Sequence, residues 1–117
     1  MRRGEVWSVS GGPDYAGKPR PAVIVQDDAF NPGDSVTLCP LTTDSKGGPL
    51  ARVSVEATAS NGLRQNSRLM VDKIITVPIA KLGARIGVLS DTDMDALDQA
   101  MLVFLGLASA GRRRASG

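Results

Sequence analysis

Short runs of β-branched and apolar residues, separated by turn-forming residues, recur along most of the chain. Val23, Ile24 and Val25 form a continuous apolar run, which is typical of a buried strand. Other segments alternate apolar and polar positions, which is typical of strands with one buried face. Pro40 falls near the end of one apolar segment, where a strand needs no further backbone donor. The pattern predicts strands at residues 5–9, 23–25, 35–41, 51–55, 67–75 and 85–88, with a short turn at 79–83.

The segment 90–105 instead has the spacing of an amphipathic helix. Ser90 is a good N-cap, and the aspartates of the first turn complement the helix dipole. The apolar positions that should pack on the sheet are Met94, Leu97, Met101, Phe104 and Leu105. Strands followed by one C-terminal helix predict an α+β domain built on a small β-barrel of antiparallel strands.

Arg20 lies between two prolines, directly before the apolar run of the second strand. Pro19 and Pro21 keep the chain extended and prevent a helix from starting there. Arg20 is therefore either an ordinary surface arginine or a fixed guanidinium at the mouth of a core strand. The preceding segment 10–17 is rich in turn formers and delivers the chain to this position.

Two other stretches hold candidate chemistry. Residues 42–49 combine hydroxyl side chains, Lys46 and glycines, which suits a phosphate, although such hydroxyls also satisfy the backbone of an ordinary hairpin loop. Asp72 stands inside an apolar run, where a partly buried carboxylate needs a partner. It either faces a site or lies at a strand edge in water. Trp7 is expected in the core or an interface rather than as a platform for base stacking.

Composition excludes several kinds of site. The 117 residues contain one cysteine, Cys39, and no histidine. A disulfide framework, a zinc site of the usual nitrogen and sulfur ligands, and a triad that needs imidazole are therefore excluded. No apolar run approaches the length of a membrane span, and the N-terminus lacks the apolar region of a signal peptide. We expect a cytoplasmic protein that does not associate with membranes.

The net charge of +2 hides an uneven distribution. Residues 1–89 hold eleven Lys and Arg against eight Asp and Glu, whereas the predicted helix at 90–105 holds four Asp and no cation. Residues 112–114 add three arginines in a tail expected to be disordered. An anionic ligand such as a nucleic acid should therefore bind the part of the chain before the helix.

Five blocks of the sequence together resemble the toxins of the MazF/PemK family. They are residues 1–7, 20–25, 39–49, 71–76 and 102–107, and they occur in the family's order over nearly the whole chain. The resemblance implies one toxin domain at 1–109, followed by the basic tail 110–117. It implies an SH3-like barrel, shared with the gyrase poison CcdB, and a homodimer. It also implies an endoribonuclease that cleaves single-stranded mRNA without metal or other cofactor, and a cognate MazE-like antitoxin whose acidic tail occupies the RNA groove.

The resemblance also assigns roles to individual residues. Arg20 matches the family's catalytic arginine and Thr42 its catalytic threonine. Asp72 matches a functional aspartate of the PemK branch, although Met70 stands where that branch has an arginine. The loop before Arg20 is short and lacks the acidic or histidine element of many members, which leaves Asp14, Asp44 and Asp72 as candidate general bases. The residues expected to contact RNA are Lys18, Thr43, Ser45, Lys46 and Arg68.

The expected chemistry is attack of the RNA 2′-hydroxyl on the adjacent phosphorus, which leaves a 2′,3′-cyclic phosphate and a 5′-hydroxyl. A cation and fixed donors must then stabilise the dianionic transition state. Arg20 suits this role because its guanidinium fork binds two phosphate oxygens, and it is poorly suited to act as a base. The alternative hypothesis is a CcdB-like gyrase poison, or a non-catalytic module of the same fold that binds RNA or antitoxin.

Overall fold

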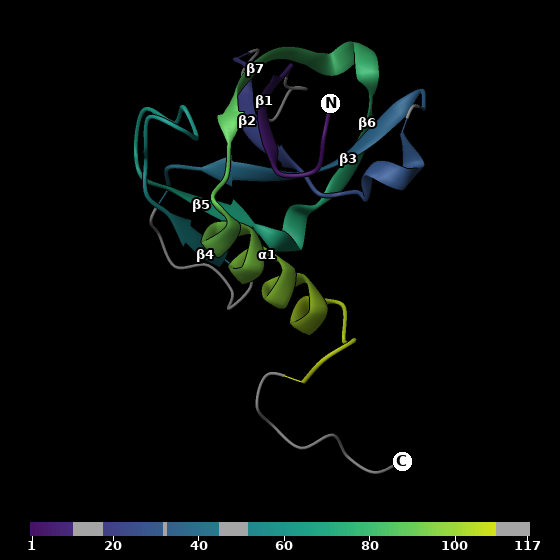
Figure 1. Ribbon diagram of the computed structural model, residues 1–117, viewed down its shortest axis with the longest axis vertical. Helices are drawn as coiled ribbons and strands as arrows, with labels where there is room; N and C mark the ends of the chain where they lie inside the picture. The colour runs from purple at the N-terminus through teal and green to yellow at the C-terminus, as the bar shows by residue number, and fades with distance from the viewer. Residues whose placement is uncertain (11–17, 32, 45–51, 110–117) are drawn as a thin grey trace.

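The computed structural model describes residues 1–10, 18–31, 33–44 and 52–109 (Figure 1). Seven strands precede a single α-helix in this part of the chain. The strands are β1 (Glu5–Val9), β2 (Arg20–Ile24), β3 (Ser35–Thr42), β4 (Arg52–Val55), β5 (Ser67–Met70), β6 (Ile75–Pro78) and β7 (Leu82–Val88). Three short 3-10 turns, η2 (Asp28–Phe30), η3 (Val71–Lys73) and η4 (Ile79–Lys81), join them, and the helix α1 is Asp91–Phe104. The predicted tail at 110–117 lies outside the described residues.

The strands form one antiparallel sheet in the order β4-β5-β3-β2-β1-β7, and β6 also pairs with β3. The sheet curves around a core, and α1 lies below it in Figure 1. The predicted α+β class is confirmed. The described pairings join neither β4 nor β6 to β7, so the sheet is an open one rather than a closed barrel. The edge of β7 is partly covered, because the backbone N–H of Val88 donates to the carbonyl of Ser60 at 2.9 Å.

Strand β3 is the centre of this arrangement. One edge pairs with β2, whereas the other pairs first with β6, up to Leu38, and then with β5, from Leu41. Pro40 lies between these two partners, so the strand tolerates its missing backbone donor. The strand predicted at 35–41 is confirmed and extends one residue further, to Thr42.

Three other predicted strand boundaries were wrong. The second strand, predicted at 23–25, begins at Arg20 and ends at Ile24. The single strand predicted at 67–75 is divided by η3, because the chain turns at residues 71–73 and continues as β6 beside another part of β3. The last strand is longer than predicted and begins at Leu82, directly after η4. Pairing with β1 along its length extends this strand across Gly83 and Gly87.

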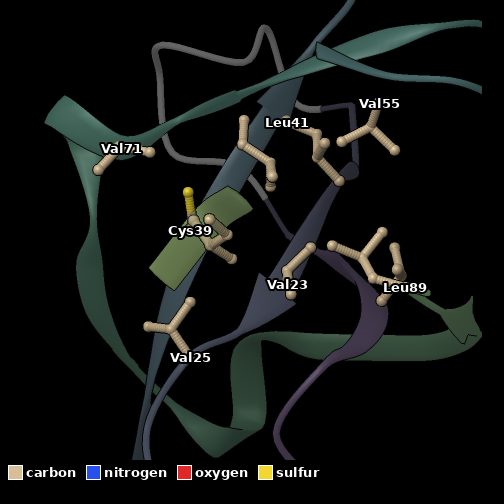
Figure 2. Packing of buried hydrophobic residues seen from close by; sticks show 10 residues of the cluster. Val23, Val25, Cys39, Leu41, Val55, Val71 and Leu89 are labelled. Carbon is tan, nitrogen blue, oxygen red and sulfur yellow. The ribbon is translucent and has the colours of Figure 1, made fainter. Parts of the chain in front are cut away.

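Both faces of the central strands are buried. Val23, Cys39 and Leu41 point into one apolar cluster, together with Val55, Val71, Leu89 and Leu97, and most of these side chains are visible in Figure 2. Their neighbours along β2 and β3 point into a second cluster, which contains Val9, Ala22, Ile24, Val36 and Leu38. The alternation explains why both strands are almost continuously apolar. Burial raises the pKa of the Cys39 thiol to about 12, so this cysteine is a neutral core residue.

The helix α1 has the predicted N-cap, since the hydroxyl of Ser90 accepts the backbone N–H of Asp93 at 3.1 Å. Leu97 is fully buried, and Met94 and Met101 pack against the first cluster. The prediction that Phe104 and Leu105 pack on the sheet was wrong, because they are 48% and 62% exposed. In the last turn of α1, the apolar residues of the predicted stripe no longer face the sheet. No helix in the described part of the chain is long and apolar enough to cross a membrane.

Candidate functional site

The two residues predicted to be catalytic lie near the same end of paired strands. Arg20 begins β2 and Thr42 ends β3. The pairing between these antiparallel strands reaches Ala22 and Pro40, and Arg20 and Thr42 each lie two residues beyond it. Continued by two residues, the same register would set Arg20 opposite Thr42, on one face of the sheet. Arg20 also pairs with Val9 of β1, which fixes it from the other side.

Arg20 lies at the boundary between two hollows in the surface. The smaller, of about 270 Å³, is mostly apolar and includes Val9, Ala22 and Leu38 in its lining. The larger, of about 640 Å³, has Lys18, Arg20 and Arg64 in its lining and is called the basic cavity below. The described residues that line it are Ser8, Lys18, Pro19, Arg20, Pro21, Thr43, Gly62, Leu63, Arg64, Gln65, Ser67 and Ile86.

The basic cavity combines cations with hydrogen-bond donors. Lys18, Arg20 and Arg64 supply three positive charges, and hydroxyl or amide side chains line the same space. No Asp or Glu is among the described lining residues. Positive charge gathered in a concave surface attracts anions, and arginine and hydroxyl donors bind phosphate oxygens. Two predicted RNA-contacting residues, Lys18 and Thr43, therefore share a basic cavity with Arg20.

The hydroxyl group of Thr42 can donate a hydrogen bond to a ligand. It is half-buried, and its Oγ1 accepts the backbone N–H of Asp44 at 3.1 Å. A hydroxyl that accepts one hydrogen bond keeps its own proton for a second partner. The turn also places the carboxylate of Asp44 two residues from Thr42, at the same end of β3.

Asp72 has the partner that its sequence context required, and that partner is Arg52. Two hydrogen bonds, of 2.8 and 3.3 Å, join the guanidinium to the carboxylate. The hydrogen bonds from Arg52 hold the pKa of Asp72 below its ordinary value. Asp72 lines neither hollow, and its side chain joins η3 to β4.

The remaining predicted residues are placed differently. Arg68 lies opposite Thr42 in the pairing of β3 with β5, and it does not line either hollow. Asp14, Ser45 and Lys46 lie outside the described residues. Among the residues that the structure does describe, no group of three His, Cys, Asp or Glu side chains could hold a metal ion.

Sequence patterns did not single out two polar residues of the basic cavity, Arg64 and Gln65. They follow the Asn61–Gly62 turn, and that dipeptide was the sole local signal. It indicates that the chain turns, but it does not indicate which surface the next residues face.

Trp7 has a structural role. Its indole Nε1–H donates to Glu5 at 3.0 Å, and its ring packs against the second apolar cluster. Trp7 is half-buried at the edge of this cluster, and its predicted place in the core or an interface is met only in part.

The fold and the site thus define a small α+β domain with a basic cavity lined by Arg20 and Thr43. Residues 2–105 match the family described as "PemK-like, MazF-like toxin of type II toxin-antitoxin system". The chain belongs to this family.

Relatives of known name agree with this assignment. A Mycolicibacterium smegmatis protein named "Probable endoribonuclease MazF" is 47% identical over 108 residues, which cover 92% of this chain and 99% of that protein. The solved structure of "Mycobacterium tuberculosis toxin MazF-mt6" superposes with a TM-score of 0.74 at 30% identity, covering 89% of this chain and 98% of the other. A mycobacterial structure described as "Endoribonuclease in complex with its cognate antitoxin" has a TM-score of 0.77 at 25% identity and covers 92% of this chain and 97% of its own.

Proposed function

We propose that this protein is the toxin of a type II toxin–antitoxin system and a metal-independent endoribonuclease that cleaves single-stranded mRNA at specific sequences. The observation that supports the proposal is the basic cavity lined by Arg20, together with Thr43, the residue that follows Thr42 at the end of β3. The names of the relatives, endoribonuclease MazF among them, support the same activity. The protein acts in the cytoplasm, where its substrate is.

In the proposed reaction, the 2′-oxygen of one nucleotide forms a bond to the adjacent phosphorus while the bond from phosphorus to the 5′-oxygen breaks. The negative charge that develops on the phosphoryl oxygens is stabilised by the Arg20 guanidinium, which can bind two of them. Thr42 donates a hydrogen bond from its hydroxyl to the same phosphate. A base takes the proton of the 2′-hydroxyl, and the departing 5′-oxygen takes a proton from water, so that a cyclic phosphate and a 5′-hydroxyl result.

Of the candidate bases, we propose Asp44 rather than Asp72. Asp72 is held by two hydrogen bonds from Arg52, and its lowered pKa makes it a weaker proton acceptor. Asp44 follows Thr42 within one turn and is exposed. Asp14, outside the described residues, is the remaining candidate, and a variant at each position separates the two.

The proposed partners follow from the same surface. A basic cavity that binds RNA phosphates also suits the acidic tail of a cognate antitoxin, and a mycobacterial relative is described in complex with its antitoxin. The toxin acts as a homodimer, as the family resemblance implies.

Cleavage of a long single-stranded RNA in buffer containing EDTA tests the proposal. The wild-type protein should produce discrete fragments with cyclic phosphate ends, and Arg20→Ala should produce none while its dimer remains intact in size-exclusion chromatography. Undiminished cleavage by Arg20→Ala would contradict the site. Absence of cleavage by the wild type, together with inhibition of gyrase, would favour the CcdB-like alternative.

A further inference from the structure

The basic cavity has a second wall that the proposed chemistry does not use. Gly62, Leu63, Arg64 and Gln65 of the connection between β4 and β5 line it, together with Ser67, the first residue of β5. Arg20, Lys18 and the adjoining prolines come from the start of β2. The cavity therefore lies between the catalytic strand end and a loop far from it in sequence.

The buried side chain of Asn61 stabilises the conformation of this loop. Its side chain is 2% exposed and makes three hydrogen bonds to the backbone. The amide oxygen accepts the N–H groups of Thr58 and Leu63, each at 3.0 Å, and the amide nitrogen donates to the carbonyl of Glu56 at 2.8 Å. A buried amide with these bonds satisfied holds the turn in one conformation.

At two glycines, the backbone of this loop and the backbone of β7 lie in direct contact. Gly62 has a φ of +70°, and a Cβ on it would lie 2.2 Å from the carbonyl oxygen of Ile86. A Cβ on Gly87 would lie 2.4 Å from the carbonyl oxygen of Ser60. The loop backbone and β7 are thus in direct contact, and no side chain separates them. Arg64 lies two residues beyond Gly62, so these contacts also hold its backbone in place.

The guanidinium of Arg64 has no hydrogen bond or ion pair with any described residue, and the residue is exposed. It shares the cavity with Lys18, whose amine is equally unpaired within the described chain, and with Arg20. Like charges gathered in one concavity repel one another, and an anion between them removes that repulsion. The cavity volume of about 640 Å³ is within the range of ligand pockets, roughly 300–1,000 Å³.

We propose that Arg64 binds a second phosphate of the RNA, one that neighbours the scissile phosphate held by Arg20. This inference rests on the proposed function and adds a substrate-binding position to it. Arg64 contacts a phosphate that does not react, so it contributes equally to the ground state and the transition state. Its loss should raise KM and leave kcat nearly unchanged, whereas loss of Arg20 should lower kcat.

The test is binding of a single-stranded RNA that cannot be cleaved because every 2′-hydroxyl is methylated. Fluorescence anisotropy gives the dissociation constant of the wild type and of Arg64→Gln at several KCl concentrations. Each phosphate contact to a single strand contributes about 0.7 to the slope of log K against log salt. We expect Arg64→Gln to lower that slope by about 0.7 and Arg64→Lys to retain most of it.

Arg2→Gln is the matched control, since it removes the same charge from an exposed arginine that lines neither hollow. Its slope should equal that of the wild type. An unchanged slope and KM for Arg64→Gln, in a wild-type background that binds and cleaves RNA, overturn the inference and leave the proposed function standing. A wild type that neither binds nor cleaves RNA overturns the proposed function, and the second phosphate position with it.

Discussion

Glu5 of β1 accepts the Nε–H of Arg85 from β7 at 2.9 Å. The same carboxylate accepts the backbone N–H of Arg2 at 2.8 Å and the indole N–H of Trp7 at 3.0 Å. Burial alone would raise the pKa of Glu5, but the hydrogen bonds from Trp7, Arg2 and Arg85 outweigh it and lower the pKa from 4.5 to about 2. A single buried carboxylate thus ties the first strand to the last one.

This relationship predicts how stability depends on pH. The folded pKa of Glu5 is depressed, so its contribution is complete above pH 4.5 and is lost as the pH falls towards 2. The full contribution is on the order of 3 kcal/mol at most. Glu5→Gln should therefore lower the free energy of unfolding at pH 7 by up to that amount and change it little at pH 2. Urea titrations at the two pH values measure this, and an equal loss at both would contradict the assignment.

Asp44 and Asp72 should respond differently to the same substitution. Asp44→Asn should lower kcat by about 10²–10⁴-fold if Asp44 is the general base. Asp72→Asn should leave kcat within tenfold and lower stability by about 2 kcal/mol, because it weakens a charged hydrogen-bond pair with Arg52. Single-turnover cleavage and thermal melting separate the two effects. If Asp44→Asn cleaves normally and Asp14→Asn does not, the base is Asp14.

Arg20 should not be replaceable by lysine. Arg20→Lys keeps the charge but loses the planar fork that holds two phosphate oxygens. We expect kcat to fall by about 10²–10³-fold, the usual effect of removing a donor from a developing oxyanion. Thr42→Val should cause a comparable loss, and Thr42→Ser, which retains the hydroxyl, should restore most of the activity. A Thr42→Val protein with wild-type kcat would exclude the hydroxyl from the reaction.

The contact between Gly62 and β7 predicts that a substitution far from Arg20 and Thr42 in the sequence also weakens RNA binding. Gly62→Ala places a Cβ against the Ile86 carbonyl at a positive φ, so the loop must move. We expect a loss of stability of about 1–3 kcal/mol and a rise in KM, because Arg64 moves with the loop. Asn31→Ala, in a loop that lines neither hollow, controls for a general loss of stability.

The helix and the first four strands could be predicted because their signals are local. Ser90 caps the helix from its own side chain, and strand periodicity is visible within five residues. The break between β5 and β6 could not be predicted. Leu69, Met70 and Val71 are all buried, so the apolar run continues through the turn. The chain bends there because β5 and β6 pair with different parts of β3, and this pairing is visible in the structure alone.

The catalytic roles of Arg20 and Thr42 come from the family resemblance and stay a prediction, whereas the structure places both residues at the same end of paired strands. The role of Asp72 as the partner of Arg52 could not be predicted, because those residues are brought together by β4 and η3 from separate parts of the chain. Arg64 was missed for a similar reason. Its position in the cavity depends on Asn61 and on Gly87 of β7, and neither sets a pattern around Arg64 itself.

The lining of the basic cavity begins at Ser8 and ends at Ile86, so the cavity is assembled from most of the polypeptide. A ribosome adds residues in order, and its exit tunnel delays folding of the segment made last. A nascent chain therefore has no complete cavity until β7 has been synthesised and released from the tunnel. The proposed RNA cleavage therefore requires a chain that has been synthesised at least as far as Ile86.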